Sequence, residues 1–231
     1  MKDLFGKALL DYQNHQFSED IITSSNISDE DVLPISYLFR SYKDMPKLEQ
    51  KALKLAKGSI LDIGCGAGSH SLYLQEKGFQ VKAIDISKGA IDVCKLRGAK
   101  HAEVKNILDE TGTFDTILLL MNGTGIFQEL FQVSKFLTHL KSLLKSNGHI
   151  LIDSSDIKYM YEDEDGGFWI DAHANYYGEL DYYLSYKGKK EKPMKWLYLD
   201  FDRLKLACEN IGLTCIKVME GNHYDYLAKL Y

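Results

Sequence analysis

The sequence of 231 residues is poor in cysteine and proline, with only four and three of them. The cysteines form no Cys-x-x-Cys pair and are not accompanied by a cluster of histidines, which argues against a zinc site or any other bound metal. We therefore expect reduced thiols that fill small apolar spaces, as in cytoplasmic proteins. They are Cys65, Cys94, Cys208 and Cys215.

Long apolar runs and a strong excess of one charge are also missing. No segment approaches the roughly 20 apolar residues of a membrane-spanning helix, and the first residues lack the apolar core and cleavage site of a secretory signal. The formal net charge of −5 argues against a mainly electrostatic partnership with nucleic acid. These absences predict a soluble, cytoplasmic protein that binds neither membranes nor nucleic acid and has a small or neutral partner.

An alternation of short apolar runs and amphipathic stretches begins near residue 58. Near-continuous apolar strands separated by helices are typical of a parallel sheet that is covered on both faces. Two further strands close the chain, and the tight turn between them requires them to be antiparallel. The sequence thus predicts an α/β, doubly wound, mostly parallel seven-stranded sheet with an antiparallel last strand. The expected strands are 59–63, 79–85, 101–107, 114–121, 149–155, 213–221 and 223–231, and the longest helix is 131–148.

Two segments stand outside this alternation. Residues 1–57 are expected to be an N-terminal helical extension. Tyrosines alternate with polar residues in 176–200 around a Lys/Gly/Pro turn, which predicts a β-hairpin insertion after the fifth strand. Because no linker or repeat divides the chain, we expect a single Rossmann-like domain over 1–231. In it, 1–57 would be a helical lid and 58–231 the core.

The stretch "ILDIGCGAGSHSLYLQEKGFQVKAIDIS", residues 60–87, places a glycine-rich turn between a strand and a helix. Glycines allow a sharp turn and let a ligand approach the main chain, where the first N–H groups of the helix can bind it. About 20 residues further on, Asp85 ends the next strand, where a carboxylate can accept both hydroxyls of a ribose. The three glycines Gly64, Gly66 and Gly68 and this acid predict an adenosine-containing cofactor.

Two details bear on which cofactor this is. Ser69 occupies the position where a dinucleotide fingerprint has its third glycine. Asp62 precedes the first glycine, where a carboxylate would repel a pyrophosphate but attract an ammonium group. S-adenosylmethionine (SAM) carries an ammonium and a sulfonium and no phosphate, so Asp62 favours SAM. The alternative for Asp62 is a solvated carboxylate at a strand end.

The stretches "ILDIGCGAGSHSLYL", "AIDIS" and "FDTILLLMNG" resemble three motifs of the class I SAM-dependent methyltransferases. The order of elements resembles that family from about residue 57 to the end of the chain. The resemblance implies that Asp62 and the glycines face the methionine half of SAM. It also implies that Asp85 binds the ribose and Ile86 packs on the adenine. The other implied contacts are Asn106 and Ile107 at the adenine edge, where many members have an aspartate in place of Asn106, and Met121 and Asn122 near the sulfonium.

No catalytic residue can be named, because methyl transfer from a sulfonium mainly requires positioning and the exclusion of water. Weaker candidates for substrate binding lie in the N-terminal segment, after the glycine turn and in the long loop after the fifth strand. Each has a structural alternative: an amphipathic lid helix, a polar first helical turn or a solvated acidic loop. The candidates are Tyr37, Arg40, His70, Asp156 and Tyr159, with Tyr161, Trp169 and His173 in the same loop.

The function that these features predict is methyl transfer from SAM to an unidentified small-molecule acceptor. A nicotinamide-dependent oxidoreductase, a non-catalytic SAM-binding module and an aminopropyl transferase that uses decarboxylated SAM are the alternatives. The fold itself does not choose between them, because different functions share it.

Overall fold

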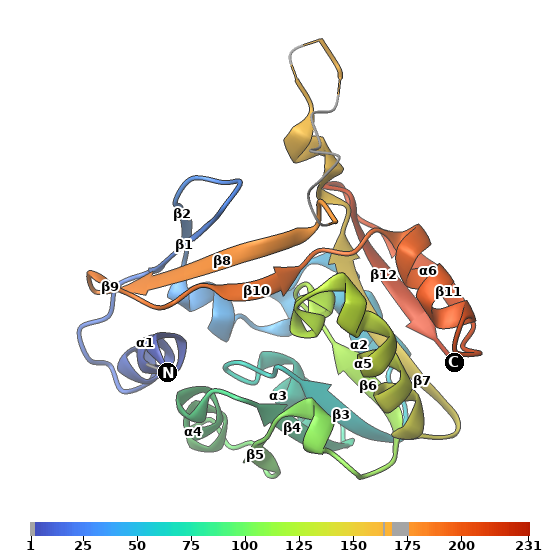
Figure 1. Ribbon diagram of the computed structural model, residues 1–231. Coiled ribbons are helices and arrows are strands. Elements are labelled where there is room, and N and C mark those ends of the chain that lie inside the picture. The colour runs from blue at the N-terminus through green and yellow to red at the C-terminus, as the bar shows by residue number, and fades with distance from the viewer. Residues whose placement is uncertain (1–2, 164, 168–175) are drawn as a thin grey trace.

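The computed structural model describes residues 3–163, 165–167 and 176–231 (Figure 1), so Trp169 and His173 lie outside the described residues. A seven-stranded sheet has the order β11-β12-β7-β6-β3-β4-β5, in which β12 runs in the opposite direction to the other six strands. The predicted mostly parallel sheet with an antiparallel last strand is confirmed. Its strands are β3 (Ser59–Ile63), β4 (Gln80–Asp85), β5 (Ala102–Val104), β6 (Phe114–Leu119), β7 (Leu144–Ser155), β11 (Cys215–Glu220) and β12 (Asp225–Leu230).

Helices cover both faces of this sheet. On one face Leu48 and Ala52 of α2 and Leu74 of α3 pack against Leu118 and Leu151, with α4 beside them. On the other face α5 and α6 enclose the larger apolar cluster. None of the helices in the described ranges is long and apolar enough to cross a membrane. The helices are α2 (Lys47–Leu55), α3 (Ser69–Glu76), α4 (Lys88–Leu96), α5 (Val133–Ser142) and α6 (Phe201–Glu209).

The helix predicted over 131–148 extends too far, because α5 ends at Ser142 and β7 already begins at Leu144. Leu144 pairs with Phe114 of β6, and the register shifts before the regular parallel pairing resumes at Thr116. The polar sequence "KSNG" that follows Leu144 has little apolar surface to bury as a helix. Its backbone turns instead at Asn147, which has φ +65°.

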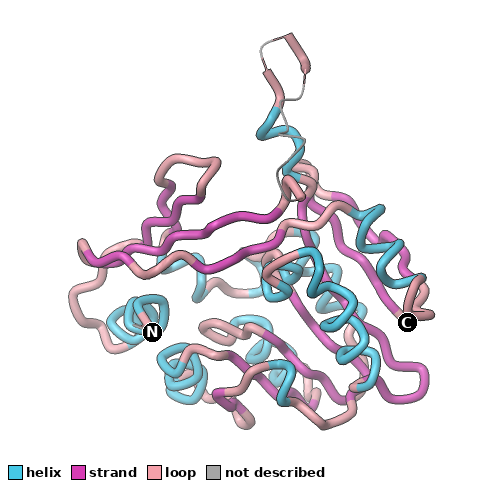
Figure 2. Tube along the Cα trace, in the orientation of Figure 1, coloured by secondary structure: helices cyan, strands magenta, loops and turns pink. Residues whose placement is uncertain are grey.

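A second, antiparallel sheet has the order β10-β8-β1-β2, with β9 paired to β8. The predicted hairpin at 176–200 is present, but it joins strands from the N-terminal segment (Figure 2). The expected N-terminal helical extension over 1–57 contains α1 (Leu4–Gln13) and α2, but residues 21–25 and 31–33 form strands that were not predicted. The run "IITSS" contains β-branched residues, which favour strands, and it finds a partner in β8. The strands are β1 (Ile21–Ser25), β2 (Asp31–Leu33), β8 (Glu179–Tyr186), β9 (Lys189–Lys190) and β10 (Met194–Leu197).

The N-terminal helix α1 packs between β8 of the small sheet and α4, which covers the large sheet. Leu9 of α1 belongs to an apolar cluster that includes Ala90 of α4 and Leu184 of β8. Asp3 caps α1 and also accepts hydrogen bonds from the backbone N–H of Gly89 and the hydroxyl of Ser87, both at 2.9 Å. Figure 1 shows α1 below β8 and beside α4, so the N-terminal segment bridges the small sheet and the core.

We predict that Gly89→Ala weakens the docking of α1. A Cβ at Gly89 would lie 2.5–2.6 Å from the backbone of Gly6, so the two helices would have to separate. We expect a loss of about 1–3 kcal/mol in the free energy of unfolding, although alanine has the better helix propensity. Urea denaturation would measure it against Lys95→Ala, on the exposed side of α4. Equal stability of the two variants would show that the close approach is unimportant.

Candidate functional site

The glycine loop between β3 and α3 has a left-handed backbone at all three predicted glycines. Gly64, Gly66 and Gly68 have φ values of +69°, +53° and +82°. The loop is held at its base by the Gly64 N–H, which donates to the carbonyl of Ile84 at 2.9 Å. Among the residues that the structure describes, a Cβ added at Gly66 would meet only Phe5, at 3.8 Å. The space above Gly66 is therefore open, as a cradle for a ligand requires.

Asp85 lies beside this loop because β3 and β4 are parallel neighbours in register. Its two carboxylate oxygens accept hydrogen bonds from the N–H groups of Gly66, at 3.0 Å, and Ser87, at 2.8 Å. Burial raises the pKa of Asp85 above its usual value, and these two N–H groups act in the opposite direction. The next residue, Ile86, is 74% exposed. The loop thus presents an acid and an uncovered apolar side chain next to the open glycine turn.

Asp62 is buried at the end of β3, with 2% of its surface exposed. The hydroxyl of Ser71, in the first turn of α3, donates to its carboxylate at 2.6 Å. Burial raises the pKa of Asp62, while the nearby His70 acts to lower it. A solvated strand-end carboxylate, the alternative that the sequence left open, is excluded.

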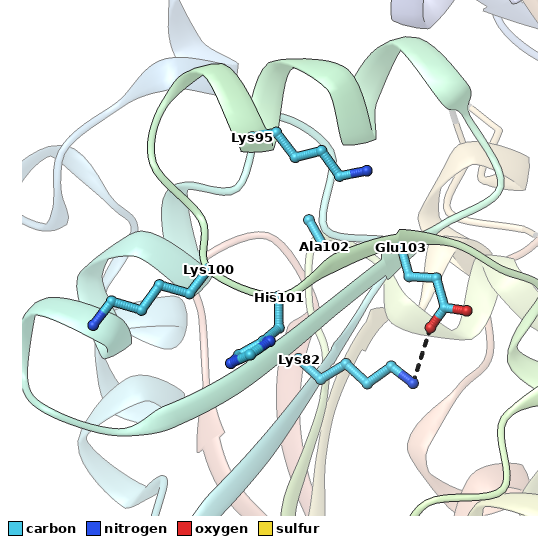
Figure 3. Close-up of a pocket in the computed structure, with 6 residues that line it drawn as sticks. All are labelled: Lys82, Lys95, Lys100, His101, Ala102 and Glu103. Carbon is cyan, nitrogen blue, oxygen red and sulfur yellow. Dashed lines mark ion pairs between the residues drawn. The ribbon is translucent and has the colours of Figure 1, made fainter.

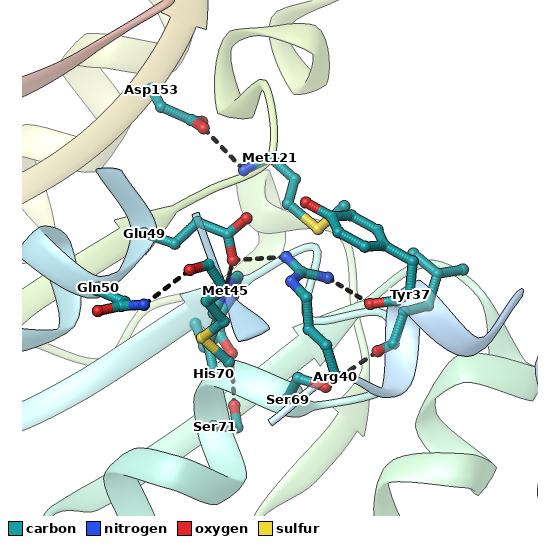
Figure 4. A network of polar contacts seen from close by, with 12 residues as sticks. Tyr37, Arg40, Met45, Glu49, Gln50, Ser69, His70, Ser71, Met121 and Asp153 are labelled. Carbon is teal, nitrogen blue, oxygen red and sulfur yellow. Dashed lines mark hydrogen bonds and ion pairs between the residues drawn. The ribbon is translucent and has the colours of Figure 1, made fainter. Parts of the chain in front are cut away.

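Tyr37, Arg40 and His70 come together around a residue that the sequence analysis missed, Glu49 of α2 (Figure 4). One carboxylate oxygen of Glu49 lies 2.5 Å from Arg40 Nη2 and 2.6 Å from His70 Nε2. Arg40 also donates to the carbonyl of Tyr37 at 2.8 Å and stacks on its ring at 4.2 Å. Burial alone would raise the pKa of Glu49, but His70 and Arg40 lower it below its usual value.

The turn after β6 carries Met121 and Asn122. Met121 is 37% exposed, and its N–H donates to Asp153 of β7 at 3.0 Å. The side chain of Asn122 is turned toward β10, where its amide N–H donates to the carbonyl of Leu197 at 3.2 Å. Asn122 therefore belongs to a turn, and its side chain bonds the hairpin. Asp153 is the second residue that the sequence analysis missed.

Asn106 and Ile107 follow β5 at the other end of the predicted cofactor site. The side chain of Asn106 accepts a hydrogen bond from the N–H of Leu108 at 2.9 Å and begins a short 3-10 helix. Ile107 is 5% exposed and packs in the main apolar cluster. Its side chain therefore faces the core, and only its backbone could meet an adenine edge.

Asp156 and Tyr159 belong to a separate cluster at the end of β7. The hydroxyl of Tyr177 donates to Asp156 at 2.8 Å, and that of Tyr176 donates to Asp200 at 2.7 Å. Tyr159 stacks on Tyr224 with ring centroids 5.0 Å apart. In addition, Tyr161 donates from its hydroxyl to the carbonyl of Tyr177. The candidates for substrate binding therefore fall into two groups, one at Glu49 and one in this tyrosine-rich cluster.

A pocket at the outer edge of the large sheet contains none of the predicted site residues (Figure 3). It is lined by Lys82 of β4, Lys95 of α4 and residues 100–103. Lys82 is paired with Glu103 at 3.0 Å and with the buried Glu110 at 2.7 Å. Among the described side chains, no group of three or more His, Cys, Asp and Glu could hold a metal ion.

Glu49 and Asp153 each had a weak signal in the sequence. Glu49 is three and four residues before Ala52 and Leu53, so it shares the buried face of α2. Asp153 directly follows the aliphatic residues 150–152, so a charged residue ends the apolar part of this strand. A charged residue on an apolar face is usually solvated, and only the packing of Arg40 and His70 shows that Glu49 is not.

Comparison with known proteins gives a consistent result. Residues 36–218 match the family described as "Methyltransferase domain". The chain is 46% identical to a SAM-dependent methyltransferase from Bacteroides fragilis whose crystal structure is a complex with S-adenosyl-L-homocysteine (SAH). That comparison has a TM-score of 0.93 and covers 100% of this chain and 94% of the other.

Curated relatives are more distant. The putative methyltransferase YqeM of Bacillus subtilis is 27% identical over 104 residues, which are 42% of this chain and 42% of the relative. The ubiquinone biosynthesis O-methyltransferase of Rickettsia typhi is 28% identical over 107 residues, 43% of this chain and 42% of the relative. The chain thus spans less than half the length of these curated relatives.

We predict that Glu49→Gln destabilises the fold, because it leaves the buried charge of Arg40 without a carboxylate. Removing one partner of a buried ion pair costs about 3–5 kcal/mol, and the amide that remains should keep the loss near 3 kcal/mol. Since the pKa of Glu49 is lowered in the folded protein, the advantage of the wild type should be complete above the usual glutamate pKa. It should disappear as the pH falls through the lowered pKa.

Urea denaturation at several pH values would measure this, with Lys51→Ala on the exposed side of α2 as the control. A Glu49→Gln variant as stable as that control at neutral pH would contradict the ion-pair account.

Proposed function

The chain belongs to the class I SAM-dependent methyltransferases, and we propose that it transfers a methyl group from SAM to a small-molecule acceptor. The observation that supports this best is the open left-handed turn at Gly66, which is joined to Asp85 by a 3.0 Å hydrogen bond. It provides the space and the carboxylate that an adenosine-bearing ligand needs.

In this proposal the cofactor lies along the carboxyl ends of β3, β4 and β6. Asp85 accepts the ribose hydroxyls, and the exposed Ile86 packs on the adenine. The buried carboxylate of Asp62 attracts the ammonium group of the methionine half. Arg40 is 7% exposed, and its Nε has no hydrogen-bond partner among the described residues. A buried cationic donor of this kind is suited to the carboxylate of the same methionine half.

SAM supplies a methyl group that its sulfonium charge already activates. The residues of this chain need to orient the two reactants and to exclude water. The N-terminal segment 1–57 carries Tyr37, Arg40 and Glu49 over the glycine loop, and we propose that it acts as the lid. The hairpin 176–200 would form the wall of the acceptor site, since β10 is bonded to the turn that follows β6.

Two of the three alternative functions that the sequence left open would need a different ligand in this site. A nicotinamide cofactor would bring its pyrophosphate close to the buried Asp62, which is unfavourable. Decarboxylated SAM, the donor of an aminopropyl transferase, would leave Arg40 without the carboxylate proposed for it. A non-catalytic SAM-binding module would have the same cofactor site and differ only in the absence of turnover.

The test of the proposed function is SAH formation from SAM in the presence of small amines, phenols and carboxylic acids. An acceptor that raises SAH production above the level without acceptor supports methyl transfer. Binding of SAM without turnover for any acceptor class would favour the non-catalytic alternative.

We predict that Asp85→Ala weakens the binding of SAM by about 1.5–3 kcal/mol, as expected for the loss of charged hydrogen bonds. Isothermal titration calorimetry measures this directly. Asp92→Ala on α4 removes a carboxylate that pairs with the exposed Lys88 and should leave affinity unchanged. Wild-type affinity in Asp85→Ala would remove the ribose assignment.

Gly66→Val should abolish SAM binding, because the side chain would fill the open space of the turn and disfavour φ +53°. Cooperative urea unfolding of the variant would show that the fold survives. If the variant still bound SAM, the loop would not be the cofactor cradle.

A further inference from the structure

The turn that follows β6 has an unfavourable backbone. Met121 and Asn122 are consecutive residues with φ +67° and +59°. Residues other than glycine adopt this left-handed conformation at a cost in free energy that the surrounding contacts must offset. Gly123 completes the turn in a confined space, because a Cβ there would lie 2.5 Å from the Cβ of Leu119. Contacts with neighbouring residues therefore hold the backbone of Met121 in a conformation that methionine does not favour by itself.

Asp153 of β7 holds the turn from below. Its Oδ2 accepts the N–H of Met121 at 3.0 Å, and its Oδ1 accepts the N–H of Gly123 at 2.9 Å. The residue is 9% exposed. Because Ile152 pairs with Leu119 in the parallel ladder, Asp153 lies directly beside the start of the turn. Figure 4 shows its carboxylate next to Met121, near Glu49 and Tyr37. Both acceptor oxygens are thus used to fix one turn.

The next residue, Ser154, ties the same turn to the hairpin. Its hydroxyl lies 2.6 Å from the hydroxyl of Thr124 and 2.9 Å from the side-chain oxygen of Asn122. It also accepts the N–H of Leu199 at 2.9 Å. The side chain of Asn122 reaches the carbonyl of Leu197 at the end of β10. One connected network therefore joins β7, the turn and the hairpin.

We propose that Asp153 is a positioning residue for methyl transfer, which acts by holding residues 121–123 in the left-handed turn that places Met121 against the cofactor. This inference rests on the proposed function. Asp153 itself touches neither reactant in this account. Its effect passes through the backbone of the turn, and the hairpin supports the turn from the other side through Asn122.

The ionisation of Asp153 should control the two hydrogen bonds that it accepts from the turn. Burial, the main cause, raises its pKa to about 6, with the nearby Glu49 acting in the same direction. The other titratable groups that face it are Tyr37 from the lid, Tyr198 beyond β10 and Tyr226 of β12, which stay neutral at this pH because their pKa values are raised. Above about pH 6 both oxygens can accept an N–H. Below it one oxygen carries a proton, so one hydrogen bond of the turn is lost.

The test compares the affinity for SAH and SAM, by calorimetry between pH 5 and pH 7.5, in the wild type and Asp153→Asn. The variant mimics the protonated carboxyl, because it keeps one acceptor oxygen and turns a donor toward the other N–H. We expect about tenfold weaker binding at pH 7.5, the usual effect of one charged hydrogen bond. We also expect the fall in wild-type affinity below pH 6 to be smaller in the variant, in which the other buried carboxylates, Asp62 and Asp85, still titrate. Asp225→Asn, on the neighbouring β12, is the control with an unchanged profile.

A second comparison separates the backbone mechanism from a general loss of structure. Asn122→Ala and Asn122→Gly both remove the side-chain amide, but only glycine adopts the left-handed conformation without cost. Combined with Asp153→Asn, the glycine variant should bind SAH at least about threefold more tightly than the alanine variant. Thermal unfolding of each protein checks that the fold is retained.

Equal affinity and equal pH profiles in the wild type and Asp153→Asn would overturn the inference, as would the absence of any rescue by glycine. A wild-type protein that binds neither SAH nor SAM would overturn the proposed function, and this inference with it. Wild-type binding with an unaffected Asp153→Asn variant would overturn this inference alone.

Discussion

The hydrogen bond from the Gly66 N–H to the Asp85 carboxylate joins the two turns on which the proposed cofactor site depends. It forms because β3 and β4 are parallel and in register, so that the loops after them lie side by side. The glycines keep the space above the loop open, and the same carboxylate remains available to a ligand. The register of these two buried strands thus places the two turns of the proposed cofactor site side by side.

Around this centre the buried acids of the site are held in different ways. Glu49 is balanced by Arg40 and His70, Asp62 is bonded to Ser71, and Asp153 is bonded to backbone N–H groups. The first arrangement ties the N-terminal segment to the core, and the third ties the turn after β6 to β7. A buried carboxylate anchors the N-terminal segment, while Asn122 and Ser154 bond the hairpin to the core, and the two segments pair with each other in the small sheet.

The sequence was sufficient for features that depend on local patterns. The apolar run "SILDI" became β3 over the predicted residues, and Gly64, Gly66 and Gly68 have the left-handed backbone for which glycine is needed. What could not be predicted depends on contacts between distant segments. The strand at "IITSS" exists because β8 pairs with it, and the burial of Glu49 follows from the positions of Arg40 and His70. β8 is more than 150 residues from this strand, and Arg40 and His70 are nine and 21 residues from Glu49, outside α2.

A calorimetric titration of the purified protein with SAM, SAH and NAD tests the proposed cofactor site most directly. We predict micromolar binding of SAM and SAH and no binding of NAD, because the open glycine turn lies beside the buried Asp62. Binding of NAD alone would contradict it, since Asp62 would then lie next to a pyrophosphate.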